Sequence, residues 1–289
     1  MDWKIKGSPS QIILDSQIYR KAGEVATLMN EYFITKVKNL QSGFTGQNID
    51  LSGCHSAMAS KSCSLDLGYV SLKTVERIIM NLKSSKAVAV DELDSFSLKM
   101  SAKIISAPVH HLVTLSLMQQ KFPTSWKYAK VLPLHKKGCE MDRKNYRPVS
   151  ILSPVSKILE RAVYDQLYFY FSRNRIFHQN IMGYRKNRST QSAILQMYDR
   201  WVRGAANGMV SGIVLLDLSA AFDLVSPPIL HKKLEIYGLK QEFINWIDSY
   251  MCNRKQAVWI DHILSEFLPY RVGVPQGSNL RPGIIMDKS

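Results

Sequence analysis

The run Val-Ser-Gly-Ile-Val-Leu-Leu-Asp at residues 210–217 is the clearest signal of a buried strand in this 289-residue chain. Its continuous apolar stretch predicts a buried strand, with Asp217 at the carboxyl end of that strand. Open α/β folds place their sites at this edge. A carboxylate held there suits Mg²⁺, a hard cation that takes oxygen ligands and keeps several waters. From position alone, an aspartate that caps the next turn is an equally good interpretation.

Phe222 and Asp223 close the segment that follows, Leu-Ser-Ala-Ala-Phe-Asp at residues 218–223. Phe222 is near enough along a turn to flank the pocket of Asp217, although an isolated aromatic is more often part of a core. Asp223 is a candidate second carboxylate, although after a tight turn it need not face the same ion. Phe222 and Asp223 are therefore candidate members of the Asp217 site, but they do not show which reaction that site performs.

On both sides of this predicted strand, the sequence predicts further helices and strands. Apolar residues at helical spacing predict helices over residues 15–39 (with Asp15 as N-cap), after Ser71, and over 97–105, 108–119, 154–171, 189–206, 229–237 and 241–251. The helix over 189–206 is expected to pack through Ala193, Ile194, Met197 and Trp201. Strand-like runs cover residues 128–135, 145–151, 256–260 and 267–274, and a long loop is expected over 41–67. Helices before and between strands predict an α+β fold.

The formal net charge of +15 is most simply explained by a polyanionic partner, with solvated Lys-rich faces as the alternative. A predicted hairpin over residues 128–151 turns at Lys136-Lys137-Gly138 and carries interleaved cations and aromatics: Trp126, Lys127, Tyr128, Lys130, Lys136, Lys137, Arg143, Lys144, Tyr146 and Arg147. A second basic stretch contains Tyr184, Arg185, Lys186, Arg188, Arg200 and Arg203. This mixture fits phosphate contacts and base stacking, so a nucleic-acid partner is favoured.

Other function classes find little support. No apolar run approaches the length of a membrane span, and the first residues have no apolar centre typical of a secretory signal. We therefore expect a cytoplasmic or nuclear protein that is not secreted and has no membrane partner. Cys54-His55 with Cys63 weakly resembles a zinc site, but its spacing is wrong, and free thiols are the better interpretation.

Residues 273–278 read Gly-Val-Pro-Gln-Gly-Ser. Glycine permits a close backbone approach and proline stiffens the turn. The amide of Gln276 both donates and accepts hydrogen bonds. The segment therefore has the chemistry of a loop laid against a nucleic-acid backbone or base, while an ordinary turn is the simpler interpretation when it is taken alone.

Taken in order, six segments resemble the reverse transcriptases of LINE-type and jockey-like non-LTR retrotransposons. They are Phe122-Pro123 with Trp126-Lys127; Lys136-Lys137-Gly138; Asn-Tyr-Arg-Pro-Val-Ser at 145–150; Gly183-Tyr184-Arg185 with Arg188-Ser189-Thr190; Leu-Asp-Leu-Ser-Ala-Ala-Phe-Asp at 216–223; and Gly-Val-Pro-Gln-Gly-Ser at 273–278. Each motif is weak alone, whereas the ordered set with family-like gaps is specific. The resemblance covers the chain from about Ser71 to Pro282.

The resemblance implies a right-hand polymerase with fingers and an incomplete palm. Its divisions would be an N-terminal helix and linker over residues 1–70, fingers over 71–208 and a partial palm over 209–289. It also implies an RNA-directed DNA polymerase whose partners are an RNA template, a DNA primer and deoxynucleoside triphosphates. Two Mg²⁺ ions would serve phosphoryl transfer in the complete family site.

The same resemblance implies roles for single residues. Asp217 would be the catalytic metal ligand, assisted by the backbone carbonyl of Leu218. Phe222 would exclude ribonucleotides, because a ring packed against the 2′ position leaves no room for a hydroxyl. The other implied contacts are Lys136 or Lys137 and Arg147 to the triphosphate, Gln276 and Gly277 near the templating base and primer, and Tyr184, Arg185 and Arg188 to the template backbone.

Some positions depart from the family pattern. The family supplies further metal-binding carboxylates from an Ala-Asp-Asp hairpin after the 273–278 segment, and no Asp-Asp pair occurs in these 289 residues. Arg281 stands where a small residue is usual, and Ala89 and Glu92 stand near positions where glycine is usual. We therefore expect a truncated, inactive copy. The alternatives are a non-catalytic RNA- or DNA-binding fragment, or a gene fragment that forms no stable protein.

Overall fold

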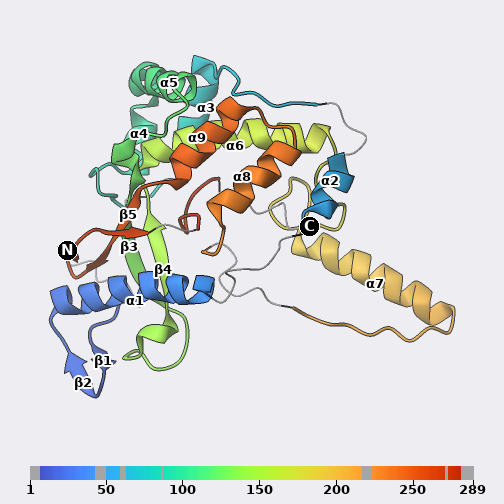
Figure 1. Cartoon of the computed structure of the whole chain (residues 1–289). Coiled ribbons are helices and arrows are strands. Elements are labelled where there is room, and N and C mark those ends of the chain that lie inside the picture. The colour runs from blue at the N-terminus through green and yellow to red at the C-terminus, as the bar shows by residue number, and fades with distance from the viewer. Residues whose placement is uncertain are drawn as a thin grey trace.

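A computed structural model describes residues 7–42, 50–58, 63–85, 87–216, 223–270 and 273–280 (Figure 1). Its strands are β1 (Ile12–Leu14), β2 (Gln17–Tyr19), β3 (Tyr128–His135), β4 (Tyr146–Ile151), β5 (Arg254–Ile260), β6 (Ile263–Leu264) and β7 (Leu268–Tyr270). Its α-helices are α1 (Ala22–Ser42), α2 (Ser52–Met58), α3 (Leu72–Met80), α4 (Ser95–Met100), α5 (Ala102–Met118), α6 (Pro154–Arg173), α7 (Thr190–Ala206), α8 (Pro227–Ile236) and α9 (Gln241–Met251). Short 3₁₀ turns cover Thr124–Lys127 and Arg143–Asn145.

A mixed sheet forms the centre, in the order β4-β3-β5-β6, with β7 also paired to β5. Strands β3 and β4 are antiparallel, whereas β3 and β5 are parallel. Helix α1 lies across the sheet, and its Val25, Met29 and Phe33 form one core with Val131 and Val258. This mixed content agrees with the predicted combination of helices and strands.

A second, larger core lies among the helices. Helices α3, α5, α6, α8 and α9 contribute to it, with Ile158 and Leu159 of α6 fully buried. Trp246 of α9 is also fully buried, and its indole nitrogen donates to Ser116 Oγ at 3.0 Å. None of the helices that the structure describes is long and apolar enough to cross a membrane.

Several local predictions are confirmed. The predicted basic hairpin is β3–β4, and Lys136 N donates to Asn145 O at 2.8 Å to close its base. Helix α6 begins at Pro154 behind the N-cap Ser153, whose hydroxyl accepts from Ser156 N. A capping box at Ser189 starts α7. These features depend on neighbouring residues, which is why the sequence reveals them.

Other local predictions were wrong. The N-terminal helix begins at Ala22 rather than Asp15, because Asp15 and Ser16, with φ of 51° and 65°, form the two-residue turn between β1 and β2. Helix α2 lies within the expected loop over 41–67. Helix α5 runs unbroken through Pro108.

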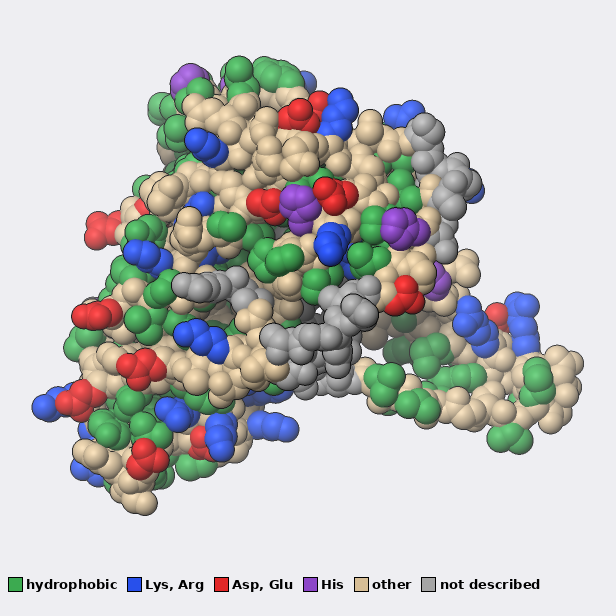
Figure 2. Space-filling model, in the orientation of Figure 1, with side chains coloured by type: hydrophobic (Ala, Val, Ile, Leu, Met, Phe, Trp, Pro, Cys, Tyr) green, Lys and Arg blue, Asp and Glu red, His purple; other side chains and the backbone are tan. Residues whose placement is uncertain are grey.

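The largest difference concerns residues 190–216, here called the arm, which projects from the body (Figure 1). Residues 210–216 form no strand, and Val214 and Leu216 are 83% and 87% exposed. The predicted packing of α7 was also wrong, since Ile194 is 58% exposed and Gly204 is its only buried residue. Hydrophobic side chains are exposed on the arm, between polar surface and several Lys and Arg side chains (Figure 2). The apolar run remains unpaired because no described strand lies beside it.

Candidate active site

The segment Gly-Val-Pro-Gln-Gly-Ser, extended here to residues 273–280 and called the 273–280 loop, joins two distant motifs. Gly273 N donates to Val225 O at 3.1 Å, and Ser150 N at the end of β4 donates to Gln276 O at 2.9 Å. The loop therefore brings the end of the 216–223 motif beside the 145–150 motif. Three segments that lie far apart in the chain converge here.

Two glycines make this convergence possible. Gly277 has φ of +134°, and a Cβ there would lie 2.6 Å from Ser150 O. Gly273 has φ of +88°, and a Cβ there would lie 2.7 Å from the backbone of Asp223. A side chain at either position would be strained in conformation and would push the neighbouring strand or turn away.

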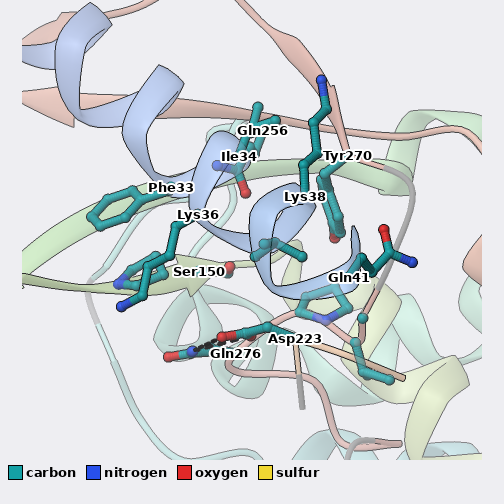
Figure 3. A pocket seen from close by; sticks show the side chains of 15 residues that line it. Phe33, Ile34, Lys36, Lys38, Gln41, Ser150, Asp223, Gln256, Tyr270 and Gln276 are labelled. Atoms are coloured by element: carbon teal, nitrogen blue, oxygen red, sulfur yellow. Dashed lines mark hydrogen bonds between the residues drawn. The ribbon is translucent and has the colours of Figure 1, made fainter. Parts of the chain in front are cut away.

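Gln276 and Asp223 meet in a cavity of about 300 Å³ (Figure 3). Gln276 Nε2 donates to the two carboxylate oxygens of Asp223 at 3.2 and 3.3 Å. Helix α1 covers the cavity with Phe33, Ile34, Lys36, Val37, Lys38 and Gln41. The sequence interpretation placed this helix in an N-terminal helix and linker segment over residues 1–70 and missed its contribution to the cavity, for which no sequence signal was available.

The far end of the 273–280 loop is held by buried side chains. Ser278 Oγ and Tyr250 Oη lie 2.7 Å apart. Asn279 N donates to Glu160 Oε2 at 2.8 Å, and the Asn279 side chain donates to Lys157 O at 2.8 Å. The loop is thus fixed to α6 and α9 on one side and to β4 on the other, which pre-organises Gln276.

Glu160 and Arg254 are fully buried charged residues near this anchor. Burial raises the pKa of the Glu160 carboxyl, although Arg254 and Asn279 N–H favour its charged form. Burial would lower the pKa of Arg254, but Tyr250, Tyr270 and Glu160 outweigh it and raise that pKa. The Arg254 guanidinium stacks on the Tyr250 ring at 4.1 Å. The burial of Glu160 could have been predicted from the sequence, because Glu160 falls on the apolar face of α6.

The predicted triphosphate ligands lie apart from this cavity. Lys136, Lys137 and Arg147 are exposed on the β3–β4 hairpin. Pro148 and Ser150 line the cavity, so the alternation of side chains along β4 turns Arg147 to the opposite face. The structure therefore brings Gln276 to Asp223 but not to the basic residues of the hairpin.

Most other cations and aromatics of the hairpin are engaged within the protein, contrary to their expected role as a stacking surface. Lys130 Nζ lies 4.7 Å from the Trp259 ring centroid and 3.3 Å from Val88 O. Burial lowers the pKa of Lys127 and that of Lys130. Tyr146 is buried, and its hydroxyl donates to Glu140 O at 2.7 Å.

The predicted template contacts occupy an exposed turn before α7. Tyr184 is 57% exposed, with φ of 59°. Arg185 is committed to the fold, because its guanidinium lies 5.2 Å from the Phe177 ring and donates to His178 O at 3.3 Å. Arg188 is exposed and contacts Met182 Sδ at 3.6 Å.

Asp217, Leu218 and Phe222 lie outside the described residues. Across the parts of the chain that the structure describes, no group of three or more His, Cys, Asp or Glu side chains is arranged to hold a metal ion. Asp223 is the carboxylate that lines the cavity, and it is already bonded to Gln276. The described residues alone therefore do not form a Mg²⁺ site.

The four cysteines are free thiols, as expected. Cys54 is buried and Tyr237 donates to its sulfur, while Tyr170 donates to the sulfur of Cys63. Both sulfurs therefore lie in packed, hydrogen-bonded surroundings.

Residues 134–286, just over half of the chain, match the family model described as reverse transcriptase (RNA-dependent DNA polymerase). The chain is 28% identical over 227 residues to the "RNA-directed DNA polymerase from mobile element jockey" of Drosophila melanogaster, covering 76% of this chain and 24% of that protein. It is 27% identical over 226 residues to the "Probable RNA-directed DNA polymerase from transposon BS" of the same species, with the same coverage of 76% and 24%. It is 26% identical over 236 residues to the jockey polymerase of Drosophila funebris, covering 79% and 26%. The chain thus spans about a quarter of the length of these curated relatives.

Proposed function

The chain belongs to the reverse transcriptase (RNA-dependent DNA polymerase) family, and from this premise we propose that it positions an RNA template, a DNA primer and a deoxynucleoside triphosphate for DNA synthesis in a non-LTR retrotransposon. The observation that carries the proposal is the 273–280 loop. It holds Gln276 between Asp223 and Ser150, so that three of the family-like motifs form one cavity.

Within this proposal, residues 71–208 act as fingers and residues 209–289 as part of a palm. Gln276 and Gly277 lie near the templating base and the primer. The rigid anchoring of the 273–280 loop supports this assignment, because a templating position must be fixed before the nucleotide arrives. Gly277 is exposed, which leaves its backbone open to close approach by a ligand.

The triphosphate is assigned to Lys136 or Lys137 and Arg147. These side chains are exposed and, in the part of the chain that the structure describes, carry no ion pair. Arginine can clamp a phosphate through two parallel hydrogen bonds, and lysine acts as a point charge. Tyr184, Arg185 and Arg188 are assigned to the template backbone, with Arg188 the more accessible of the two arginines.

Mg²⁺ belongs to the same proposal. Asp217 would hold it with the carbonyl of Leu218, and Phe222 would select against the 2′-hydroxyl. When bound, the metal would activate the primer hydroxyl and neutralise the leaving pyrophosphate. A two-ion site needs more carboxylates than Asp217. We therefore expect a polypeptide of these 289 residues alone to bind substrates without extending a primer.

The decisive experiment measures nucleotide selection without requiring chemistry. A fluorescent RNA–DNA primer–template is bound to the 289-residue protein with Mg²⁺, and its dissociation is followed with each nucleotide. The nucleotide complementary to the template should slow dissociation more than the other three. Gln276→Leu should abolish that difference, whereas Gln241→Leu on the exposed start of α9 should preserve it. Equal effects of all four nucleotides on the unmodified protein would disprove the proposed function.

A second candidate is nucleic-acid binding without catalysis. It is favoured by the exposed cations of the β3–β4 hairpin. Charge reversal at Lys136, Lys137 and Arg147 should then lower RNA affinity and its salt dependence. Primer extension with Mg²⁺ that disappears in Asp217→Asn would exclude this candidate and would also contradict the expected inactivity.

A further inference from the structure

Arg254, the first residue of β5, is a fully buried arginine close to the anchored end of the 273–280 loop. Its Nε donates to Tyr250 O at 2.7 Å, and its guanidinium lies 4.1 Å from the Tyr250 ring and 5.2 Å from the Phe122 ring. Its terminal nitrogens, Nη1 and Nη2, are buried and form no hydrogen bond with any residue that the structure describes. Because a buried cation is costly to remove from water, its presence here calls for an explanation.

Stability of the core is a weak explanation for this arginine. Glu160 is fully buried as well and interacts electrostatically with Arg254. Apolar side chains of similar volume often stabilise a core as well as a buried ion pair does, or better. Apolar side chains cannot, however, hold several polar groups in fixed directions. The groups that Arg254 contacts therefore indicate what its charge does in this protein.

Tyr250 links Arg254 to the far end of the loop. The Tyr250 hydroxyl and Ser278 Oγ lie 2.7 Å apart, and the face of the same tyrosine ring carries the guanidinium. Glu160, the buried carboxylate that interacts with Arg254, accepts from Asn279 N at 2.8 Å. A displacement of the guanidinium therefore reaches the far end of the loop by two routes, one through Ser278 and one through Asn279.

Tyr270 links Arg254 to the cavity at the other end of the loop. Arg254 on β5 and Tyr270 on β7 stand directly opposite each other in the antiparallel register, so their side chains share one face of the sheet. Burial raises the pKa of the Tyr270 hydroxyl, Arg254 opposes that shift, and Asp223 adds to it. Tyr270 also lines the cavity in which Asp223 and Gln276 meet (Figure 3). The buried guanidinium thus lies between the anchored end of the loop and the cavity wall.

We propose that Arg254 is a positioning residue for Gln276. Its guanidinium fixes the far end of the loop through Tyr250 and the cavity wall through Tyr270. Gln276 lies between these two contacts in the chain, so it keeps one orientation toward the templating base. The inference rests on the proposed function for what Gln276 contacts. Arg254 belongs to none of the recognised motifs and, being fully buried, acts only through other residues.

The test uses the complete chain and two variants that keep different parts of the arginine. Arg254→Lys retains the positive charge near Glu160 but loses the planar, stacked guanidinium. The double variant Glu160→Gln with Arg254→Met removes both charges together, because one buried charge left alone is strongly destabilising. The new amide oxygen at position 160 can still accept from Asn279 N. Val113→Ala, at a fully buried position of α5, is the control that is destabilised elsewhere in the core.

Two measurements separate positioning from a general loss of stability. The first is hydrogen exchange of the 273–280 loop relative to α1 in the free protein, which needs no substrate. This ratio should rise about tenfold in Arg254→Lys and further in the double variant, and it should stay constant in Val113→Ala. The second is the preference for the complementary nucleotide in the primer–template dissociation assay. That preference should fall about tenfold in Arg254→Lys, disappear in the double variant and persist in Val113→Ala.

Other outcomes overturn the inference or separate it from the proposed function. Unchanged loop exchange in folded variants of Arg254 overturns it, and so does faster exchange with undiminished nucleotide preference. Unfolding of both variants overturns it as well, since Arg254 would then serve the whole fold. If loop exchange rises while the unmodified protein does not distinguish the four nucleotides, Arg254 stands as the anchor of the loop and the proposed polymerase function fails.

Discussion

Gln276 Nε2 lies 3.2 and 3.3 Å from the two carboxylate oxygens of Asp223, so the 273–280 loop is bonded to the last residue of the 216–223 motif. The bond crosses 53 residues of sequence and lies at the cavity wall. It fixes the rotamer of Gln276 and satisfies a half-buried carboxylate at the same time.

This bond should be measurable as a coupling free energy between the two side chains. Asp223→Ala, Gln276→Ala and the double variant are compared with the unmodified protein by denaturant unfolding. We expect a coupling of about 1.5 kcal/mol, at the low end for a hydrogen bond to a charged group because both residues are only half-buried. Strictly additive losses in the two single variants would show that the contact contributes nothing to stability.

A methyl group at Gly277 should disrupt the junction between the 273–280 loop and β4. Gly277→Ala places Cβ 2.6 Å from Ser150 O on a backbone with φ of +134°. We expect a loss of about 1–3 kcal/mol in the free energy of unfolding. Gly183→Ala is the matched control, because its Cβ meets nothing within 4 Å, and that variant should be neutral or slightly stabilised. Equal stability of both variants would contradict the described backbone conformation.

The sequence predicts those parts of the fold that are decided by neighbouring residues. The β3–β4 hairpin and α6 follow from local periodicity and capping. Residues 210–216 show the limit of such reasoning: their apolar composition indicates a strand, but a strand needs a partner that composition cannot supply. The run is exposed because strand pairing is a property of the assembled sheet.

The candidate site, too, contains residues that the sequence predicts and residues that only the folded structure reveals. Gln276 and Gly277 were recognised from their motif, and the structure joins Gln276 to Asp223, which the sequence left as an uncertain second carboxylate. The Lys36 and Gln41 contribution from α1 depends on how α1 crosses the sheet, which no local pattern reveals. The roles predicted for Asp217 and Phe222 remain predictions, since both lie outside the described residues.

Tyr146 should make the protein lose stability as the solution becomes strongly alkaline. Burial, with help from Glu140 and Cys139, raises the pKa of Tyr146 from 10.0 to about 12. The unfolded chain therefore releases this proton near pH 10, while the folded chain keeps it until about pH 12. Stability contributed by the protonated hydroxyl is present below pH 10 and is lost as pH rises to 12.

The variant Tyr146→Phe tests whether the titration of Tyr146 causes this loss of stability at high pH. The variant should lose about 1 kcal/mol near neutral pH, where the hydrogen bond to Glu140 O is removed. Between pH 10 and 12 its stability should fall less steeply than that of the unmodified protein, as followed by denaturant midpoints at each pH. Tyr198→Phe on the exposed face of α7 should leave the steepness unchanged. Parallel curves for all three proteins would contradict the raised pKa.

The exposed run over residues 210–216 should govern self-association rather than folding. Val214 and Leu216 are 83% and 87% exposed, and no described strand pairs with them. An unpaired apolar edge of this kind templates contact with another chain. Val214→Lys with Leu216→Lys should therefore reduce concentration-dependent light scattering, while the free energy of unfolding changes by no more than about 0.5 kcal/mol. Val258→Lys, at a fully buried position of β5, is the contrasting variant and should unfold the protein. If the double lysine variant melts as early as Val258→Lys, then residues 210–216 are packed in solution, and the arm must fold against another part of the protein.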